Sequence, residues 1–183
     1  MVQYARPDAD DTDNNWTDKD GGSTLYTSID DTSTGDDATT YIKVTDTGSE
    51  ELCIVRLSDV STPGSGDAYI KYKALSEDEY GTGTAPGLKL ELLQDTTVKA
   101  TTTNTSVNTS SFTSYIYTIT DVSGISDWTD LKMRITMTPG DGSGMGADDL
   151  MKVTQVYLET QDAGGASVPI AAIAMNTYRQ MGN

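Results

Sequence analysis

Acidic side chains are the commonest ionisable groups in this chain of 183 residues, which has 28 Asp and Glu, 12 Lys and Arg, and no histidine. The lack of histidine excludes Ser-His and Cys-His catalysis, together with zinc sites built from His and Cys. The single cysteine, Cys53, lies in the apolar stretch 52–55 and is interpreted as a small buried hydrophobe rather than a catalytic thiol. Carboxylates, hydroxyls and aromatic rings therefore remain as the groups that can act.

Paired carboxylates are one route to catalysis, because glycoside hydrolysis uses two of them facing each other across a cleft. With 28 acidic residues in the chain, some convergence is expected by chance, and we predict that the protein is not an enzyme. Phosphate binding has no support, since the chain contains no Gly-x-x-x-x-Gly-Lys-[Ser/Thr] loop. The candidates for such a pair are Glu77, Asp78, Glu79, Glu91 and Glu159.

Calcium is the metal that the sequence leaves open, because it binds crowded carboxylate and carbonyl oxygens. Asp11-x-Asp13-x-Asn15 imitates the start of an EF-hand loop, but Trp16 stands where that loop needs glycine. The stretch 142–149 resembles one copy of a calcium-binding repeat, and such sites need stacked copies. We therefore predict no cofactor, with a structural Ca²⁺ ion as the open alternative.

Aromatic rings offer a third kind of chemistry. The ten tyrosines and two tryptophans make stacking on a sugar ring an option, with carboxylates accepting hydrogen bonds from its hydroxyl groups. Tyr80, beside Gly81, is the best loop candidate for contact with a glycan. Packing within the sheets is the expected use of the tyrosines in strands, which are Tyr69, Tyr72, Tyr115 and Tyr117.

Short apolar runs of period two, set between loops rich in Gly, Ser, Thr and Asp, must position these groups. The clearest runs, 88–92 and 131–138, would place one face in a core and the other in water. Regular strands separated by turns predict a single antiparallel β-sandwich of jelly-roll type with about eight or nine strands. The predicted strands are 25–30, 38–46, 51–58, 67–76, 87–95, 97–102, 113–121, 131–138 and 151–161.

Three connections carry more specific predictions. A hairpin is expected between residues 92 and 98, and one short helical turn within 121–130, where Trp128 closes an end of the sandwich. In the last strand, Met151, Val153 and Tyr157 would share one face while Val156 and Leu158 lie on the other. That inconsistent parity leaves two alternatives, a strand covered on both faces or a β-bulge that shifts the register.

The sandwich is predicted to span residues 25–162, with a flexible arm at each end. Residues 1–24 are acidic and hold too little apolar surface to fold alone, although the indole of Trp16 can anchor them to the domain. Residues 163–183 begin with a Gly-rich hinge and continue as an apolar segment that buries itself against its own domain or a neighbouring subunit. The residues expected to contact a partner are Trp16, Val168, Pro169, Ile170, Ile173, Met175, Tyr178 and Arg179.

The formal net charge of −16 acts against binding to nucleic acid and to anionic membranes. No stretch approaches the roughly 20 apolar residues of a membrane-spanning helix, and the first residues lack the basic-then-apolar order of a signal peptide. We therefore expect a protein that is made in a cytosol and binds neither nucleic acid nor membrane.

Several short motifs follow one another along most of the chain. They are Arg6-Pro7-Asp8-Ala9-Asp10, Trp16, Leu25-Tyr26-x-x-Ile29-Asp30-Asp31, Tyr41-Ile42, Ile125-x-Asp127-Trp128-Thr129-Asp130-Leu131-x-x-Arg134 and Val153-x-Gln155-Val156-Tyr157-Leu158-Glu159. In this order they resemble the jelly-roll structural proteins in the virions of tailed bacteriophages. The resemblance is greatest to capsid decoration, or cement, proteins of marine and cyanobacterial phages.

This resemblance implies a non-enzymatic role on the virion, after synthesis in the host cytoplasm. In that family, homotrimers sit on the outer surface of the phage head and clamp neighbouring subunits of the major capsid protein. The matching positions are structural, with Trp128 and Leu131 in packing and Arg134 on a strand face. The alternative from a different functional class is a carbohydrate-binding or adhesin module of a phage tail or head fibre, with a glycan as its partner.

Overall fold

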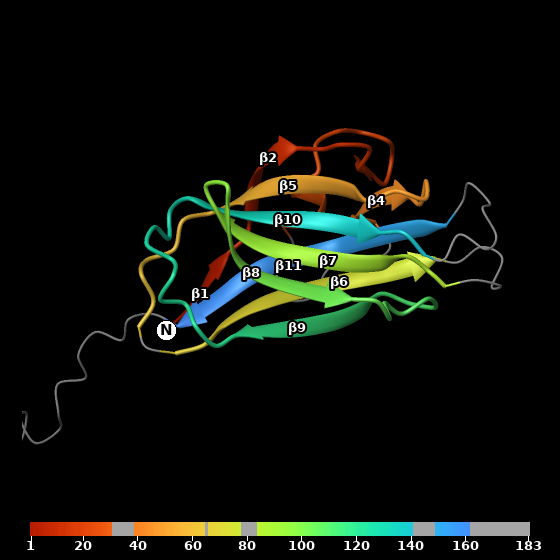
Figure 1. Ribbon diagram of the computed structural model, residues 1–183. Helices are drawn as coiled ribbons and strands as arrows, with labels where there is room; N and C mark the ends of the chain where they lie inside the picture. Colours follow the sequence, from red (N-terminus) through yellow and green to blue (C-terminus); the bar gives the residue numbers. More distant parts are fainter. Residues whose placement is uncertain (31–38, 65, 78–83, 141–148, 162–183) are drawn as a thin grey trace, which may run out of the picture.

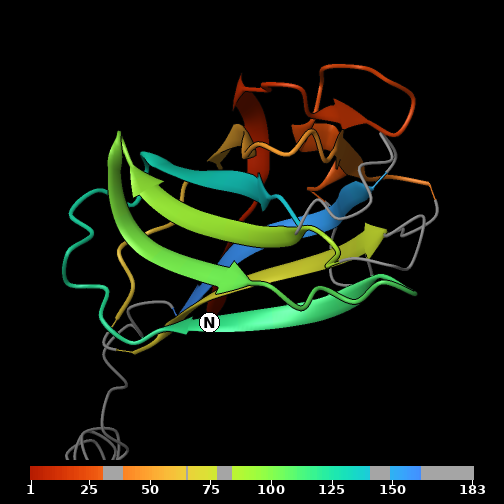
Figure 2. The same ribbon diagram turned by 45° about the vertical axis from the view of Figure 1, so that its right-hand side comes forward.

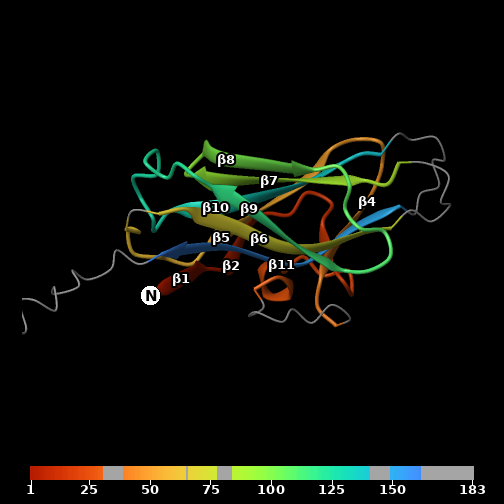
Figure 3. The same cartoon turned by 90° about the horizontal axis from the view of Figure 1, so that it is seen from below.

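Two antiparallel β-sheets packed face to face form the protein, as a computed structural model describing residues 1–30, 39–64, 66–77, 84–140 and 149–161 shows (Figure 1). Seen from below, the sheets lie as two layers (Figure 3). Sheet A contains β1 (Val2–Ala5), β3 (Thr17–Asp18), β4 (Ile42–Thr45), β6 (Ala68–Glu77), β9 (Thr113–Ile119) and β11 (Leu150–Gln161). Sheet B contains β2 (Pro7–Thr12), β5 (Glu51–Leu57), β7 (Gly87–Gln94), β8 (Thr97–Asn104) and β10 (Leu131–Thr138).

The strand order is that of a jelly roll. Sheet A has the order β3-β4-β11-β6-β9, with β1 also paired to β11, and sheet B has the order β2-β5-β10-β7-β8. Apart from β1, β2 and β3, the eight remaining strands form the two interlocked Greek keys that define this fold, in which successive strands change sheet except at the β7–β8 hairpin. The predicted antiparallel sandwich of jelly-roll type is therefore confirmed, with eleven strands among the described residues.

Apolar residues that alternate along the strands fill the space between the sheets. The two runs that the sequence marks most clearly place Leu88, Leu90 and Leu92 of β7 in this core, opposite Met133 and neighbouring residues of β10. Cys53 is fully buried, and burial raises the pKa of its thiol, so it packs as a small hydrophobe as predicted. Other fully buried large side chains are Trp16, Leu25, Ile29, Ile42, Ile70, Leu131, Ile135 and Met137.

Most predicted strands are present with ends shifted by a few residues, and two predicted elements differ. Residues 25–30 do not form a strand but contain η1 (Tyr26–Ser28), a single 3-10 turn. Residues 121–130 hold turns and bends instead of the expected helical turn, because the Asp127 carboxylate accepts the Thr129 N–H at 2.9 Å and closes a tight local turn. Trp128 is nevertheless buried there, as expected.

The first 18 residues are part of the sandwich, which corrects the prediction of a flexible arm over residues 1–24. β1 pairs with β11 in sheet A, and β2 pairs with β5 in sheet B (Figure 2). An edge strand is held by backbone hydrogen bonds, so an acidic sequence can occupy it without burying much apolar surface. The acidic composition therefore misled the prediction of this segment.

Buried contacts fix the chain between β2 and η1. The indole of Trp16 is 1% exposed, and its Nε1–H donates to the carbonyl oxygen of Glu51 at 3.1 Å. The carboxylate of Asp10 accepts the N–H groups of Leu25 and Tyr26, each at 2.8 Å. Trp16 therefore anchors this segment to the domain, as the sequence suggested.

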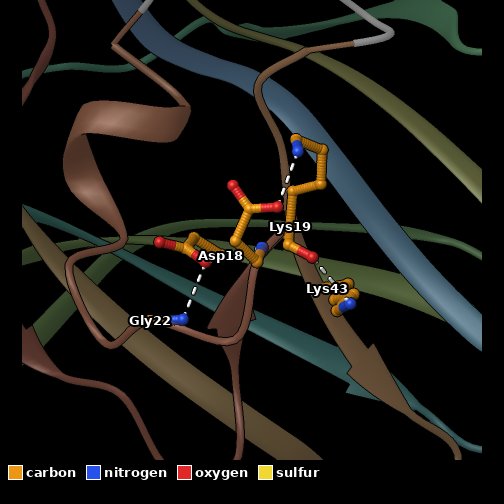
Figure 4. A network of polar contacts seen from close by, with 5 residues as sticks. Asp18, Lys19, Gly22 and Lys43 are labelled. Carbon is orange, nitrogen blue, oxygen red and sulfur yellow. Dashed lines mark hydrogen bonds and ion pairs between the residues drawn. The ribbon is translucent and has the colours of Figure 1, made fainter.

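A second carboxylate organises the loop that follows β3 (Figure 4). One oxygen of Asp18 accepts the N–H groups of Asp20 and Gly22, at 2.8 and 2.7 Å. Gly21 has φ +90°, a conformation that favours glycine, and a Cβ on Gly22 would displace the Asp18 carboxylate, which lies 2.5 Å from its position. Lys43 Nζ donates to the Lys19 carbonyl oxygen at 2.9 Å and ties the loop to β4.

The parity of the last strand is explained by a β-bulge. The register between β11 and β6 shifts between Val153 and Gln155. The extra residue, Thr154, is fully buried and its hydroxyl donates to the Thr40 carbonyl oxygen at 2.6 Å. The bulge alternative is confirmed, and its consequence is that Tyr157 lies on the outer face of sheet A.

Candidate functional site

The outer faces of the two sheets differ in their side chains. Residues that alternate with the buried positions must lie on the outer face, since strand side chains point to opposite sides in turn. On sheet B these outward positions in β5, β7, β8 and β10 hold aliphatic, hydroxyl and charged residues, without an aromatic ring. On sheet A they include three tyrosines, Tyr4, Tyr69 and Tyr157.

Two cross-strand rows define this part of sheet A. In the first, Tyr4 of β1 lies opposite Glu159 of β11, which lies opposite Tyr69 of β6. In the second, Tyr157 of β11 lies opposite Lys71 of β6. We call these five residues, with Arg6, the tyrosine platform. Tyr4 and Tyr69 are two strands apart, so their backbones are separated by about 10 Å.

Aromatic and cationic contacts hold the Tyr4 side of the platform. The rings of Tyr4 and Tyr157 meet edge to face, with centroids 5.8 Å apart. The guanidinium carbon of Arg6 lies 5.3 Å from the Tyr4 centroid and 5.0 Å from that of Tyr157. Tyr157 is buried by these contacts, whereas Tyr4 remains 46% exposed. The arrangement orients a large exposed ring with contacts that are individually favourable.

An ion pair lies between the tyrosines. Lys71 Nζ and Glu159 Oε2 are 2.7 Å apart, and the ammonium group is 5.8 Å from the Tyr69 centroid. The hydrogen bond with Glu159 raises the pKa of Lys71, so this lysine is charged at neutral pH. Each partner retains hydrogen-bonding capacity, because an ammonium has three donors and a carboxylate about four acceptor positions.

A second group of aromatic and cationic contacts lies at the opposite end of the same face. Tyr41 and Phe112 approach each other with centroids 5.9 Å apart, and Lys152 Nζ lies 5.4 Å from the Tyr41 centroid. Leu75 of β6, which lies opposite Lys152 in the register, is only 8% exposed although it points outward. Tyr41 and Phe112 are partly buried, as Tyr69 is, and Tyr4 of the tyrosine platform is the most exposed aromatic side chain among the described residues.

Charged groups on sheet B form a closed network instead of an open surface. Arg134 Nε donates to Glu91 Oε2 at 2.7 Å, and Lys89 Nζ lies 3.9 Å from the same oxygen and 3.7 Å from Glu50. The hydrogen bond from Arg134 holds the pKa of Glu91 below its ordinary value of 4.5. The carboxylate of Glu91 therefore stabilises the fold through its contacts with Arg134 and Lys89.

Replacing Glu91 by glutamine is expected to reduce the free energy of unfolding at neutral pH by about 1 kcal/mol. Because folding lowers the pKa of Glu91, its contribution is complete above pH 4.5 and is lost as the pH falls through the lower, folded-state pKa. Urea unfolding of both proteins at neutral and acidic pH should show the difference shrinking in acid. Asp59→Asn, at an exposed carboxylate outside this network, is the control, and a Glu91→Gln effect that is constant with pH would contradict the assignment.

Of the residues predicted to contact a partner, Trp16 alone lies within the part of the chain that the structure describes. Trp16 lies in the core, where its side chain cannot reach another protein, so its predicted role as a subunit contact is corrected. The other predicted contacts, Val168, Pro169, Ile170, Ile173, Met175, Tyr178 and Arg179, lie outside the described residues, as does Tyr80.

The tyrosines predicted to pack within the sheets divide into two groups. Tyr72 and Tyr115 point inward and stack with centroids 5.1 Å apart, and Tyr117 packs against the same core. Tyr69 points outward, so its ring lies outside the core, and cross-strand packing on the outer face stays its predicted use. The sequence did not predict that Tyr4 and Tyr157 belong to this surface. Tyr4 lies in the segment that was predicted to be a flexible arm, and the β-bulge in β11 changes the face on which Tyr157 lies.

The candidate carboxylates do not meet as a catalytic pair among the described residues. Glu91 is on sheet B, whereas Glu77 and Glu159 are on sheet A and bind Lys152 and Lys71. Glu77 lies opposite Leu150, at the far end of β11 from Glu159, too distant for glycoside hydrolysis. Asp78 and Glu79 lie outside the described residues.

The described part of the chain also contains no group of three or more Asp, Glu, Cys or His side chains arranged to hold a metal ion. Asp11, from the motif that imitates an EF-hand loop, instead pairs with Lys132 at 3.2 Å. Residues 142–148 of the second calcium-like motif lie outside the described residues. No helix in the described ranges is long and apolar enough to cross a membrane.

Comparisons with models of protein families and with curated proteins find no match. Solved structures do show similarity. A cyclase from Fischerella sp. TAU has 16% identity and a TM-score of 0.49, over 88% of this chain and 74% of the cyclase. The C-terminal CBM6 of LamC, a marine laminarinase from Zobellia galactanivorans, has 11% identity and a TM-score of 0.48, over 88% of this chain and 100% of the module.

A xylan-binding module, CBM15, has 11% identity and a TM-score of 0.47, over 89% of this chain and 99% of the module. TM-scores below 0.5 carry no argument about function, which has to rest on the geometry of the site. Neither the fold nor these similarities bear on the major capsid protein, a homotrimer or a location on the virion. Those roles stay predictions from the resemblance of the motifs.

Proposed function

We propose that this protein binds carbohydrate through the tyrosine platform on the outer face of sheet A. The observation that carries the proposal is the row in which Tyr4, Glu159 and Tyr69 occupy three neighbouring strands. Along this row, aromatic and charged side chains alternate on the solvent-facing surface of sheet A. The outer face of sheet B has no such row among its described strands.

The chemistry of a sugar matches this alternation. A pyranose ring has flat apolar patches of C–H groups surrounded by hydroxyl groups that donate and accept hydrogen bonds. Tyrosine rings supply flat contact surfaces with a polar tip, while Glu159 accepts and Lys71 donates hydrogen bonds. The spacing of about 10 Å between Tyr4 and Tyr69 is comparable to the length of a disaccharide.

The platform is also organised before a ligand arrives. Its side chains project from three hydrogen-bonded strands, and Arg6, Glu159 and the edge-to-face ring contact restrict their rotation. A surface that is already ordered loses little conformational entropy on binding, so more of the contact energy appears as affinity. This arrangement supports recognition of an oligosaccharide of at least two rings.

Alanine at Tyr4 or Tyr69 is expected to weaken glycan binding by about tenfold or more, since each change removes a stacking surface. A glycan array identifies the ligand, and titration calorimetry then compares the variants. Tyr4→Phe keeps the ring and should retain most of the affinity. Val98→Ala removes an exposed apolar side chain from sheet B and should leave binding unchanged. Retention of full affinity by both tyrosine-to-alanine variants would refute the proposal.

A further inference from the structure

The two ends of each sheet are edge strands, and β9 is unlike the others. Exposed edges invite pairing with another chain, and proteins commonly protect them with charges, prolines, bulges or short length. β2 has Pro7, three aspartates and irregular pairing, β8 has Lys99 at a bulge, and β3 has only two residues. Each of these strands therefore carries at least one protective feature.

β9 carries none of these features. Its sequence, Thr-Ser-Tyr-Ile-Tyr-Thr-Ile, has no charge, proline or glycine, and its pairing with β6 is regular over seven residues. No described strand pairs with its other edge, which faces the viewer in Figure 3. Ile116, in the middle of β9, is 65% exposed, the largest exposed fraction after Met1 among the large hydrophobic residues that the structure describes.

The sequence of β9 is also complementary to itself. If a second copy pairs antiparallel about a two-fold axis at Ile116, each Ile116 lies opposite the other, and each Ser114 lies opposite a Thr118. On the inner face, each Tyr115 lies opposite a Tyr117. Aromatic pairs and hydroxyl pairs directly across two strands are favourable, and this register contains no pair of like charges.

We propose that two copies of this chain form a symmetric dimer through antiparallel pairing of their β9 edges. The interface is isologous, so it closes after two copies and does not propagate. The two A sheets become one continuous sheet, and its outer faces point the same way because the two-fold axis is perpendicular to the sheet. Pairing covers the exposed Ile116 and the partly exposed rings of Tyr115 and Tyr117.

Charge does not oppose this arrangement at the contact itself. The chain has a net charge of −16, but none of it lies on β9, and the nearest charged residues in the register, Lys71 and Lys73, are on β6. Equivalent lysines of the two copies are three strand spacings apart, about 14 Å, and salt screens charges beyond about 10 Å. Salt screens the remaining long-range repulsion between the two acidic chains, so dimer formation should strengthen as ionic strength rises.

Sedimentation of the full-length chain tests the proposal. The wild type should reach twice the 19.5 kDa mass of one chain. Ile116→Lys should raise the dissociation constant by at least about tenfold, because two ammonium groups then lie directly opposite each other. Val98→Lys likewise replaces an exposed hydrophobic residue by lysine, but on β8, and should leave the dimer intact.

Disulfide cross-linking tests the register even if Ile116→Lys fails to fold. Opposite residues in an antiparallel pair have Cα atoms about 4.5 or 5.5 Å apart, within disulfide range. Ile116→Cys should therefore oxidise to a covalent dimer, whereas Ser114→Cys alone should not, since its two copies lie about 13 Å apart along the strands. A mixture of Ser114→Cys and Thr118→Cys should cross-link. Buried Cys53 does not interfere.

Four results would overturn the dimer. They are a wild-type chain that stays monomeric up to millimolar concentration, a trimer mass, a mass unaffected by Ile116→Lys, or cross-linking of Ser114→Cys alone as fast as Ile116→Cys. Loss of association on deletion of residues 162–183 would also contradict it, because the C-terminal segment would then be responsible. The inference does not depend on carbohydrate binding, and sedimentation without glycan separates the two.

Discussion

Replacement of Trp16 by alanine is expected to lower the free energy of unfolding by about 3–5 kcal/mol, the usual cost of deleting a fully buried large aromatic side chain. The indole is 1% exposed, and its N–H donates to the carbonyl oxygen of Glu51. The change removes both the packing and this hydrogen bond. A flexible arm that carried Trp16 to a partner would predict almost no change in stability.

Urea unfolding followed by far-UV circular dichroism measures this effect without relying on tryptophan fluorescence. Trp16→Phe keeps most of the ring volume and loses the hydrogen bond, so it should cost only about 1–2 kcal/mol. Asp10→Asn is an independent check on the same segment, because it weakens the carboxylate that accepts the N–H groups of Leu25 and Tyr26. If Trp16→Ala unfolded at the same urea concentration as the wild type, residues 1–18 would not be part of the cooperative domain.

Gly140→Ala should destabilise the protein by about 3 kcal/mol, at the upper end of the cost of overpacking. A Cβ at this position would lie 1.8 Å from the carbonyl oxygen of Thr84. That atom belongs to the backbone that leads into β7, so it cannot move aside as a flexible side chain would. The Gly140 N–H also donates to Asp46 Oδ2 at 2.9 Å, and displacement of the glycine breaks that bond.

The matched control for this prediction is Gly124→Ala. No atom lies within 4 Å of a Cβ built on Gly124, so the substitution should change stability by less than about 0.5 kcal/mol. Both variants lose the same backbone freedom in the unfolded chain, and their difference therefore isolates the clash. Equal urea midpoints for the two variants would show that the Thr84 segment relaxes freely.

The strands of the sandwich were largely predictable from local sequence. In β7 and β10, leucine and methionine alternate with charged residues, and burial of one face follows from geometry alone. The hairpin between β7 and β8 is also confirmed, with Asp95 in its turn at φ +54°. Such features depend on neighbours along the chain, which the sequence displays directly.

Residues at the N-terminus were harder to place. β1 and β2 lie next to β11 and β5, and these pairings are held by backbone groups that every sequence possesses. Acidic side chains neither favour nor prevent such edge pairing. The acidic composition therefore predicted a flexible arm, whereas in the structure the backbones of β1 and β2 pair with strands that are distant in the sequence.

The sequence by itself determined an antiparallel sandwich without histidine chemistry and the approximate positions of the strands from β4 to β11, because alternation is a local property. Tertiary structure alone decided that Tyr4, Glu159 and Tyr69 share one row and that Ile116 lies on an unprotected edge. The physical reason is that a face depends on register, and a single extra residue such as Thr154 reverses it. Register is set by pairing between distant strands, which the pattern of one strand does not contain.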